Sequence, residues 1–483
     1  MIFACLIGLP LAVAGLAALT PLRWQVPLAF GLAAGVTLGA VAGAVEVLGA
    51  GPRVAPMGGF PLPLGIALVL DGPGLVMILM TSAVMAATFG FLALQPTPFP
   101  RAGWPLLHLV WVGLNTLFTT ADLFNAYVAM EVMSLAGIAL IAISGTAKAL
   151  EAQIRYLLIA TMGALVYLLG TALLYGATGR LDVWAVAQID PGAPALRLAA
   201  ACITLGILVK MAAWPFHTWL PPAHSGAIAP VSALLSALVV KAPAFLLLRF
   251  WTDMFAPLAL PAAGTFLGVL GTIAIVWGSI QAMRQDQVKR VIAYSTVAQL
   301  GYLLLVIPLV AEGGAIANLA WQGGVLHAIT HGLAKAGLFL AAGSLLVTAG
   351  GDRVRDLIAT SRAAPLLGFS IGLGVISLMG LPPSVGFVGK WLLLRASLES
   401  GQWWWAVPIL GGGLLAAAYG FRLVAVTFRS GTARRRSALR AANRPPLDGL
   451  VFALVSLPML LFLAAAPLST LIGTVPGYGG LQP

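Results

Sequence analysis

Long apolar stretches recur along the whole chain, and they constrain its fold more than any other feature. Only 8% of the 483 residues are charged, whereas soluble domains carry roughly 25%. A stretch of about 20 apolar residues is long enough to cross the hydrocarbon core of a membrane as a helix. The pattern predicts an all-α polytopic membrane protein. It excludes a soluble enzyme, a disordered chain and a basic nucleic-acid-binding domain.

Scanning for stretches of this length predicts fourteen transmembrane helices, and an even number places both termini on one side. The first stretch has no Lys or Arg before its apolar core, which a cleaved signal peptide requires, so it is expected to be the first span. The predicted spans are 3–20, 26–49, 73–95, 105–119, 122–144, 154–176, 196–220, 228–251, 258–283, 290–311, 319–348, 366–395, 403–428 and 449–473.

Lys and Arg residues gather at the loops that follow odd-numbered spans, and this bias predicts the orientation. Loops rich in Lys and Arg stay on the cytoplasmic side. Lys289 counts toward these loops, whereas Arg249 counts toward the poorer even-numbered loops. Both termini are therefore expected outside. The net charge of +12 is mostly an orientation signal, although the run Arg434–Arg436 could also contact anionic lipid or a soluble partner.

Four lysines and one glutamate lie well inside the predicted spans. Lys210, Lys241, Lys335 and Lys390 fall in helices 7, 8, 11 and 12, and Glu131 falls in helix 5. Each costs about 2.5–3.5 kcal/mol at the membrane centre, so it requires protein or water around it. Either these residues form one buried hydrophilic path or they belong to unrelated ion pairs. Lysine suits a path because a buried amine can gain or lose its proton when a neighbouring charge changes, and Glu131 is expected to pair with Lys210.

Helix 11 carries His327, His331 and Lys335 at intervals of four residues. This spacing stacks the three side chains on one helical face. Because histidine exchanges protons near neutral pH, the stripe predicts a proton relay, with two core histidines or a metal pair as alternatives. A zinc-protease motif is excluded because Ala328 occupies the position where that motif requires glutamate.

Prolines lie close to these lysines. Pro215 follows Lys210 by five residues, Pro243 follows Lys241 by two, and Pro382 and Pro383 precede Lys390 by seven or eight. Proline interrupts a helix, and in a membrane the freed carbonyls must be met by protein or water. Broken helices beside mid-membrane charges are typical of transporters, often in inverted repeats. We expect helices 7 and 12 to be broken, and helices 4–8 and 9–13 are candidates for such repeats.

The two cysteines, Cys5 and Cys202, lie in apolar stretches and are expected to be small core residues. They form neither a disulfide framework nor a metal quartet. The sequence contains no iron–sulfur motif, dinucleotide fingerprint or nucleophile constellation. We therefore expect no cofactor and no metal, and no redox or hydrolytic chemistry in this chain itself.

Six motifs carry a resemblance to the antiporter-like subunits of respiratory complex I, membrane-bound hydrogenases and Mrp-type Na⁺/H⁺ antiporters. The resemblance covers residues from about Gly58 to Trp391. The motifs are DLFNAYVAMEV around Glu131, LVKMAAWPFHTWLPPAH from Leu208 to His224, VSALLSALVVK ending at Lys241, RVIAYSTVAQLGY from Arg290 to Tyr302, HAITHGLAK from His327 to Lys335, and GLPPSVGFVGKW from Gly380 to Trp391.

The resemblance implies a division of the chain and a role for each buried charge. Residues 1–100 would hold helices 1–3, 105–251 and 258–428 two inverted five-helix repeats, and 429–483 a basic cytoplasmic loop and helix 14. The implied proton path comprises the Glu131–Lys210 pair, Lys241 as the connecting lysine, His327, His331 and Lys335 as the central relay, and Lys390 as the terminal group.

The resemblance also implies the surroundings of the chain. Its partners would be antiporter-like and small membrane subunits of one complex, the lipid bilayer, protons and Na⁺, in a bacterial plasma membrane. Residues 58–71 and 122–128, together with Lys390, look most like the D-type subunit of the Mrp antiporters. Residues 223–242 look more like the hydrogenase-associated branch.

Three functions are compatible with the sequence. The first is a proton-translocating subunit of a multisubunit Na⁺ (or K⁺)/H⁺ antiporter. The second is a proton-pumping subunit of a hydrogenase or NADH-quinone oxidoreductase complex, in which the redox chemistry belongs to other subunits. The third is a structural scaffold, which the retained row of charges disfavours. In each case the chain is expected to be a membrane subunit without enzyme chemistry of its own.

Overall fold

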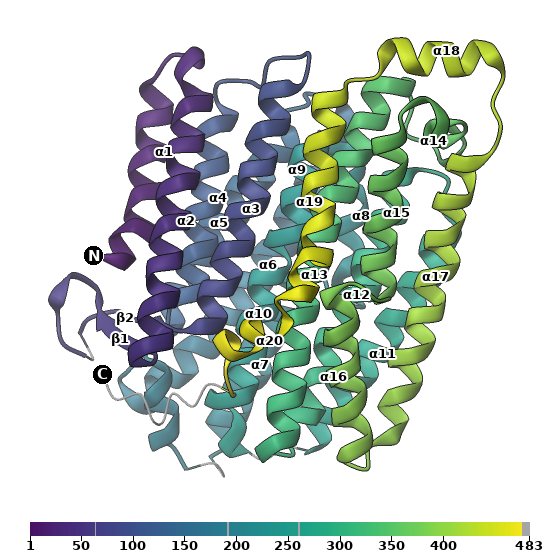
Figure 1. The fold of residues 1–483 in the computed structure, drawn as a ribbon. Helices are drawn as coiled ribbons and strands as arrows, with labels where there is room; N and C mark the ends of the chain where they lie inside the picture. Colours follow the sequence, from purple (N-terminus) through teal and green to yellow (C-terminus); the bar gives the residue numbers. More distant parts are fainter. Residues whose placement is uncertain (63, 191–192, 259–260, 476–483) are drawn as a thin grey trace.

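The computed structural model describes residues 1–62, 64–190, 193–258 and 261–475, and most of them belong to helices that stand side by side (Figure 1). Within these ranges, ten helices are long and apolar enough to cross a membrane, and Ala4–Leu19 and Pro365–Met379 are shorter apolar helices. Each of the fourteen predicted spans corresponds to a helix or an interrupted helix at that place in the sequence. The prediction of a polytopic all-α protein is confirmed.

The first part of the chain forms six long helices and one small hairpin. Strand β1 pairs antiparallel with β2, with Arg53 opposite Leu70, and Asp71 then caps α3 by accepting a hydrogen bond of 3.0 Å from the amide of Gly74. The elements are η1 Ala4–Gly8, α1 Leu9–Leu19, η2 Leu22–Trp24, α2 Gln25–Ala50, β1 Arg53–Pro56, η3 Met57–Gly59, β2 Ala67–Leu70, α3 Gly72–Leu94, α4 Gly103–Thr119, α5 Leu123–Ala142 and α6 Ala147–Thr178.

The middle of the chain contains the first interrupted helix and the most buried helices. Helix α13 packs against α12, α15, α16 and α19, so it is the centre of the second half of the bundle. The elements are η4 Val183–Gln188, α7 Pro194–Lys210, η5 Phe216–Trp219, α8 Leu220–Gly226, α9 Ala229–Leu234, η6 Leu235–Val239, α10 Lys241–Arg249, η7 Phe250–Met254, η8 Ala256–Leu258, α11 Pro261–Met283, α12 Val288–Val310 and α13 Gly314–Ala349.

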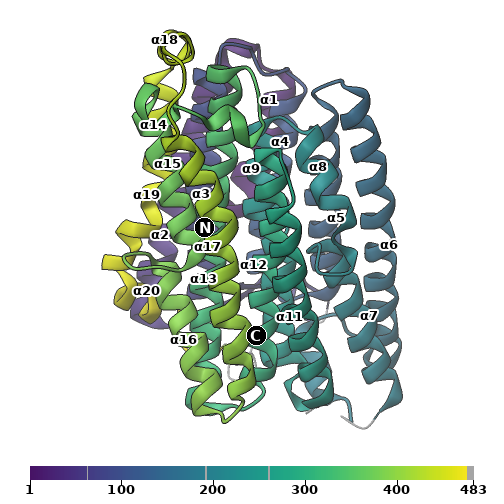
Figure 2. The same ribbon diagram turned by 90° about the vertical axis from the view of Figure 1, so that its right-hand side faces the viewer.

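The last part contains the second interrupted helix and a short basic helix, α18, that lies across one end of the bundle above α14 (Figures 1 and 2). The elements are η9 Val354–Leu357, α14 Thr360–Ala363, α15 Pro365–Met379, α16 Val385–Glu399, η10 Trp403–Trp405, α17 Ala406–Phe428, α18 Ala433–Ala442, α19 Pro445–Leu463 and α20 Ala465–Ile472.

The predicted helices 7 and 12, which are the spans 196–220 and 366–395, are broken where the prolines predict. The chain leaves helical geometry between Lys210 and Phe216, and again between Met379 and Val385. The predicted helix 8, which is the span 228–251, is not broken at its proline. Pro243 lies in the first turn of α10, and the helix continues through a π-helical turn, Leu235–Val239, just before Lys241. A π-turn of this kind is often found at functional sites.

Three assignments made from the sequence require correction. Arg249 does not lie in an exterior loop but is fully buried and paired with Asp71. Lys289 is only 6% exposed because its amine donates a hydrogen bond of 2.9 Å to the carbonyl of Ala227. Cys5 and Cys202 are partly buried rather than core residues.

Candidate functional site

The first buried charge pair joins α5 to the end of α7. Lys210 is the last residue of α7, and its amine donates hydrogen bonds to Glu131 and, over 3.0 Å, to the hydroxyl of Ser134 one turn further along α5. The lysine side chain is 2% exposed and the glutamate side chain 20%. The break after α7 therefore positions the amine against a carboxylate, and the ion pair expected from the sequence is present.

Lys241 and Lys335 are connected through hydroxyl groups on neighbouring helices. Both side chains are fully buried. The amine of Lys241 donates to the carbonyl of Ser236, whose hydroxyl lies 2.7 Å from the hydroxyl of Thr296 on α12. Thr296 donates to the carbonyl of Ile292, and Lys335 donates to the same carbonyl over 2.8 Å. Polar groups thus lie between the two amines from α10 through α12 to α13, although the carbonyl and the hydroxyl of Ser236 are joined through the residue itself and not by a hydrogen bond.

No carboxylate stabilises these two amines among the residues that the structure describes. Lys335 additionally donates to the hydroxyl of Ser295, and Ser295 also contacts the hydroxyl of Tyr419 on α17. Because carbonyls and hydroxyls accept hydrogen bonds from either form of an amine, this setting permits a lysine to be charged or neutral.

The two histidines of α13 stack in the same layer, and both are almost completely buried. The rings of His327 and His331 lie 6.0 Å apart and nearly parallel. One nitrogen of His327 lies 3.1 Å from the carbonyl of Gln299, whereas neither nitrogen of His331 has a hydrogen-bond partner among the described residues. An unsatisfied buried nitrogen is costly unless water or a moving proton meets it, so His331 is well suited to a relay.

Lys390 lies in α16, shortly after the break that separates α15 from α16. It uses the carbonyls that this break leaves free at the end of α15. Its amine donates to the carbonyls of Leu378 and Met379 over 3.1 and 3.0 Å, and it lies 4.5 Å from the centre of the Tyr302 ring. That ring packs against His327 at 4.9 Å. Tyr302 therefore separates the terminal lysine from the histidine pair by one aromatic ring.

Two glycines permit this arrangement. Gly380 adopts a left-handed conformation, φ +73°, and a Cβ there would lie 2.6 Å from Cδ of Lys390. A Cβ on Gly389 would lie 2.9 Å from the amide nitrogen of His327 and 2.9 Å from the carbonyl of Gly323. Any larger residue at position 389 would push α16, and Lys390 with it, away from α13.

The row of predicted residues is not continuous in direct contacts. Among the described residues, no hydrogen bond joins Lys210 to Lys241, or His331 to either neighbouring lysine. Lys241, Lys335 and Lys390 nevertheless interact electrostatically with His331, as does His327. The structure therefore forms a central cluster with one separate pair at the Glu131 end.

Two features of the site were given no functional role from the sequence. His224 on α8 is fully buried, stacks on Phe339 at 4.4 Å, and interacts electrostatically with Lys335, Lys289 and Lys241. Neither of its ring nitrogens has a partner among the described residues. Its place in an apolar stretch between two helix breaks was the available signal. The second feature is the Arg249–Asp71 pair, in which Arg249 also lies over the ring of Phe245 at 4.7 Å.

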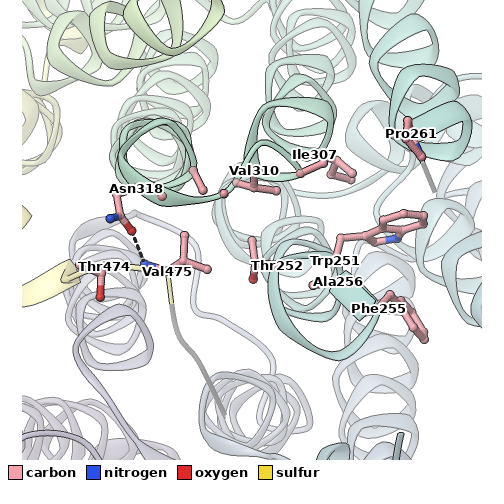
Figure 3. A pocket seen from close by; sticks show the side chains of 15 residues that line it. Trp251, Thr252, Phe255, Ala256, Pro261, Ile307, Val310, Asn318, Thr474 and Val475 are labelled. Carbon is pink, nitrogen blue, oxygen red and sulfur yellow. Dashed lines mark hydrogen bonds between the residues drawn. The ribbon is translucent and has the colours of Figure 1, made fainter. Parts of the chain in front are cut away.

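Of two cavities in the bundle, the second has a residue of this row in its wall. One, of about 600 Å³, opens between the end of α12, the start of α13 and the segment after α20, where Asn318 accepts a hydrogen bond of 2.9 Å from the amide of Val475 (Figure 3). The other, of about 350 Å³, is mostly apolar, lies between α16 and α17, and has Lys390 in its wall. Lys390 therefore borders a space between α16 and α17, whereas Lys241 and Lys335 have no exposed surface.

Comparison with known sequences identifies the family. The description NADH:quinone oxidoreductase/Mrp antiporter, transmembrane, matches residues 120–415, which is more than half of the chain. The chain belongs to this family. The matched region includes every residue of the row from Glu131 to Lys390.

Relatives of this family member bear two different names. One relative, the N-type subunit of the NADH-quinone oxidoreductase from Desulforudis audaxviator, is 37% identical over 439 residues, 88% of this chain and 85% of the relative. Another, the D-type subunit of the Na⁺/H⁺ antiporter from Alkalihalophilus pseudofirmus, is 27% identical, over 77% of this chain and 75% of the relative. These relatives favour a subunit of a redox complex, the second function considered from the sequence, over a subunit of a Na⁺/H⁺ antiporter, the first.

Solved structures share the fold over nearly the whole length. A chain of the Mrp complex from Dietzia sp. matches with a TM-score of 0.88 at 24% identity, covering 98% of this chain and 96% of that one, which is a likeness of fold alone. A chain of an archaeal membrane-bound sulfane sulfur reductase matches with a TM-score of 0.87 at 26% identity, covering 97% and 96%. A chain of Thermus thermophilus respiratory complex I matches with a TM-score of 0.72 at 27% identity, covering 96% and 99%.

Proposed function

We propose that the chain is a proton-translocating membrane subunit of a redox-driven respiratory complex. The redox chemistry belongs to other subunits, and this chain moves protons along its buried row. The residues of the row are Glu131, Lys210, Lys241, His327, His331, Lys335 and Lys390.

The observation that carries the proposal is the buried connection between Lys241 and Lys335. Two fully buried amines without carboxylates are expensive in a membrane, and simple structural pairing does not explain them. A series of hydroxyls and carbonyls between them supplies hydrogen-bond partners for either protonation state. Such a site can hold a proton on one lysine or on the other, which is what stepwise transfer requires.

The setting of this subunit follows from its relatives and its charge. The structurally similar chains come from multisubunit respiratory and Mrp complexes, which supports assembly with other membrane subunits. The basic helix α18 supports placement of its end of the bundle in the cytoplasm, with the termini outside, in a bacterial plasma membrane. The inverted-repeat division at 105–251 and 258–428 belongs to the same proposal.

Proton uptake by everted vesicles tests this function. The uptake is driven by the electron donor of the complex and is measured with a pH-sensitive dye. We expect Lys241→Ala to abolish acidification while assembly and electron transfer by the other subunits persist. Lys148→Ala is the matched control, because Lys148 is an exposed lysine at the start of α6. Acidification at the wild-type rate in Lys241→Ala would contradict the proposal.

A second candidate is a proton-conducting subunit of a Na⁺/H⁺ antiporter. The relative from the Na⁺/H⁺ antiporter supports it. The two candidates differ in their partners: the first predicts co-purification with a soluble arm that carries redox centres, the second with small antiporter subunits only. In the second case, vesicle acidification would respond to a Na⁺ gradient and not to an electron donor.

A further inference from the structure

Arginines surround a hollow at one end of the bundle. Helix α18 lies across this end of the bundle (Figure 1). The hollow has a volume of about 380 Å³, and Arg353, Arg355, Arg422 and Arg429 line it with one acidic residue, Asp286. These residues come from the α11–α12 connection, the segment around η9 and the end of α17. The proton row does not use these arginines, and an orientation signal alone does not require them to gather around one hollow.

The arginines of the hollow differ in what they already bind. Arg422 is occupied, because it pairs with Asp286 at 3.0 Å and donates to the carbonyl of Gln285 at 2.9 Å. Arg355 and Arg429 make no side-chain hydrogen bond or ion pair within the part of the chain that the structure describes. The hollow therefore presents guanidinium groups with free donors, beside a single carboxylate that is already neutralised.

The surroundings of the hollow add positive charge and an apolar side. Helix α18 is fixed above it by Arg435, which donates to the carbonyls of Ile358 and Asp356 over 3.1 and 2.7 Å. Val354, Ile358 and Val426 form the apolar part of the wall. Phe428, the last residue of α17, is 62% exposed on the outer face of that helix. The hollow thus lies where a lipid-facing apolar surface meets a cationic one.

We propose that this hollow binds the phosphate of an anionic phospholipid. Guanidinium groups bind phosphate oxygens through paired, charge-assisted hydrogen bonds, and basic pockets between transmembrane helices on the cytoplasmic side hold anionic headgroups. Arg355 and Arg429 hold the phosphate, and the acyl chains lie along the exposed apolar face of α17. The lipid thereby ties the η9 segment and α18 to the end of α17.

Titration of phosphatidylglycerol into the delipidated complex, with bound lipid counted by native mass spectrometry, tests this site. Each arginine near a membrane surface contributes about fivefold to the affinity for anionic lipid, so Arg355→Gln/Arg429→Gln is expected to weaken one binding event about 25-fold. The matched control is Arg284→Gln/Arg434→Gln, which removes the same charge from exposed positions at the same end and leaves that event unchanged.

Three results would overturn the site. Equal binding by the two double variants would show that only the overall charge matters. Displacement of the lipid by inorganic phosphate at an equal concentration would assign the hollow to a soluble anion. A structure of the assembled complex with an acidic segment of another subunit in the hollow would assign it to a protein contact. Because no transport is measured, the outcome is independent of the proposed function.

Discussion

The two broken helices place their lysines in opposite electrostatic settings. At the first break, Lys210 meets a carboxylate of its own chain, Glu131. At the second, Lys390 meets only the carbonyls of Leu378 and Met379 and the ring of Tyr302. One end of the row is a compensated ion pair, and the other is an amine without a counter-ion among the described residues.

The difference indicates how charge can move through the row. A lysine paired with a carboxylate is stabilised more strongly in its protonated form than a lysine held by carbonyls and an aromatic ring. Lys390 also borders a cavity at the edge of the bundle, where a neighbouring subunit could bring a charge close to it. The proton is therefore held most firmly at Lys210, where a carboxylate offsets the burial of the amine.

The sharpest contrast is between Lys210→Met and Lys390→Met. Both are expected to abolish proton pumping, but their effects on stability should differ. Lys210→Met leaves Glu131 without its partner, and breaking a buried pair costs about 3–5 kcal/mol, toward the lower figure because Glu131 keeps 20% exposure. Lys390→Met leaves no carboxylate behind and should keep or raise the melting temperature of the purified complex.

Equal thermal shifts for the two methionine variants would remove the distinction between the two ends. The double variant Glu131→Gln/Lys210→Met serves as the control, since it removes both charges of the pair. It should recover most of the stability lost in Lys210→Met and still fail to pump.

Glu131→Gln tests the compensated end alone. Hydrogen bonds to charged groups contribute about 1.5–3 kcal/mol, so pumping is expected to fall at least about tenfold when Lys210 loses its carboxylate. Glu151→Gln is the control, because that glutamate forms an exposed pair with Arg155 on α6. Rates of vesicle acidification measure both, and a normal rate in Glu131→Gln would mean that Lys210 does not depend on its partner.

Ser236→Ala tests the connection in the centre of the row. It removes the hydroxyl that lies 2.7 Å from Thr296. A hydrogen bond between neutral groups contributes about 1 kcal/mol, so the rate should fall about fivefold. Thr88→Val is a matched control, since its hydroxyl is buried but bonds only to Val84 in its own helix. If both variants pump alike, the bridge between Lys241 and Lys335 has no part in transfer.

Tyr302→Phe should have the smallest effect. It keeps the aromatic ring under Lys390 and removes a hydroxyl whose own hydrogen bond to the carbonyl of Ile409 is long, 3.3 Å. The expected change in rate is about twofold or less, whereas Tyr302→Leu, which removes the cation–π contact of about 0.5–2 kcal/mol, should lower the rate more. An equally large fall in both variants would assign the role to the hydroxyl rather than to the ring.

Apolar length, proline position and the four-residue spacing of α13 were sufficient to predict the spans, the two breaks and the histidine stripe. Arg249 was misplaced because hydropathy ended the span there, whereas the helix continues through Met254 and buries the charge beside Asp71. The position of the Lys289 side chain depends on its contact with Ala227, and that of His224 on its contact with Phe339. Those contacts exist only once the helices are packed, so a local pattern could draw attention to His224 but could not place either side chain.

The central claim is that one hydrated row connects Glu131 to Lys390. A high-resolution cryo-EM map of the assembled complex in lipid tests it most directly, because ordered water would be visible beside the buried amines. The account predicts water between Lys210 and Lys241 and around the unpartnered nitrogens of His331. Dry apolar packing across either of these two gaps would contradict it.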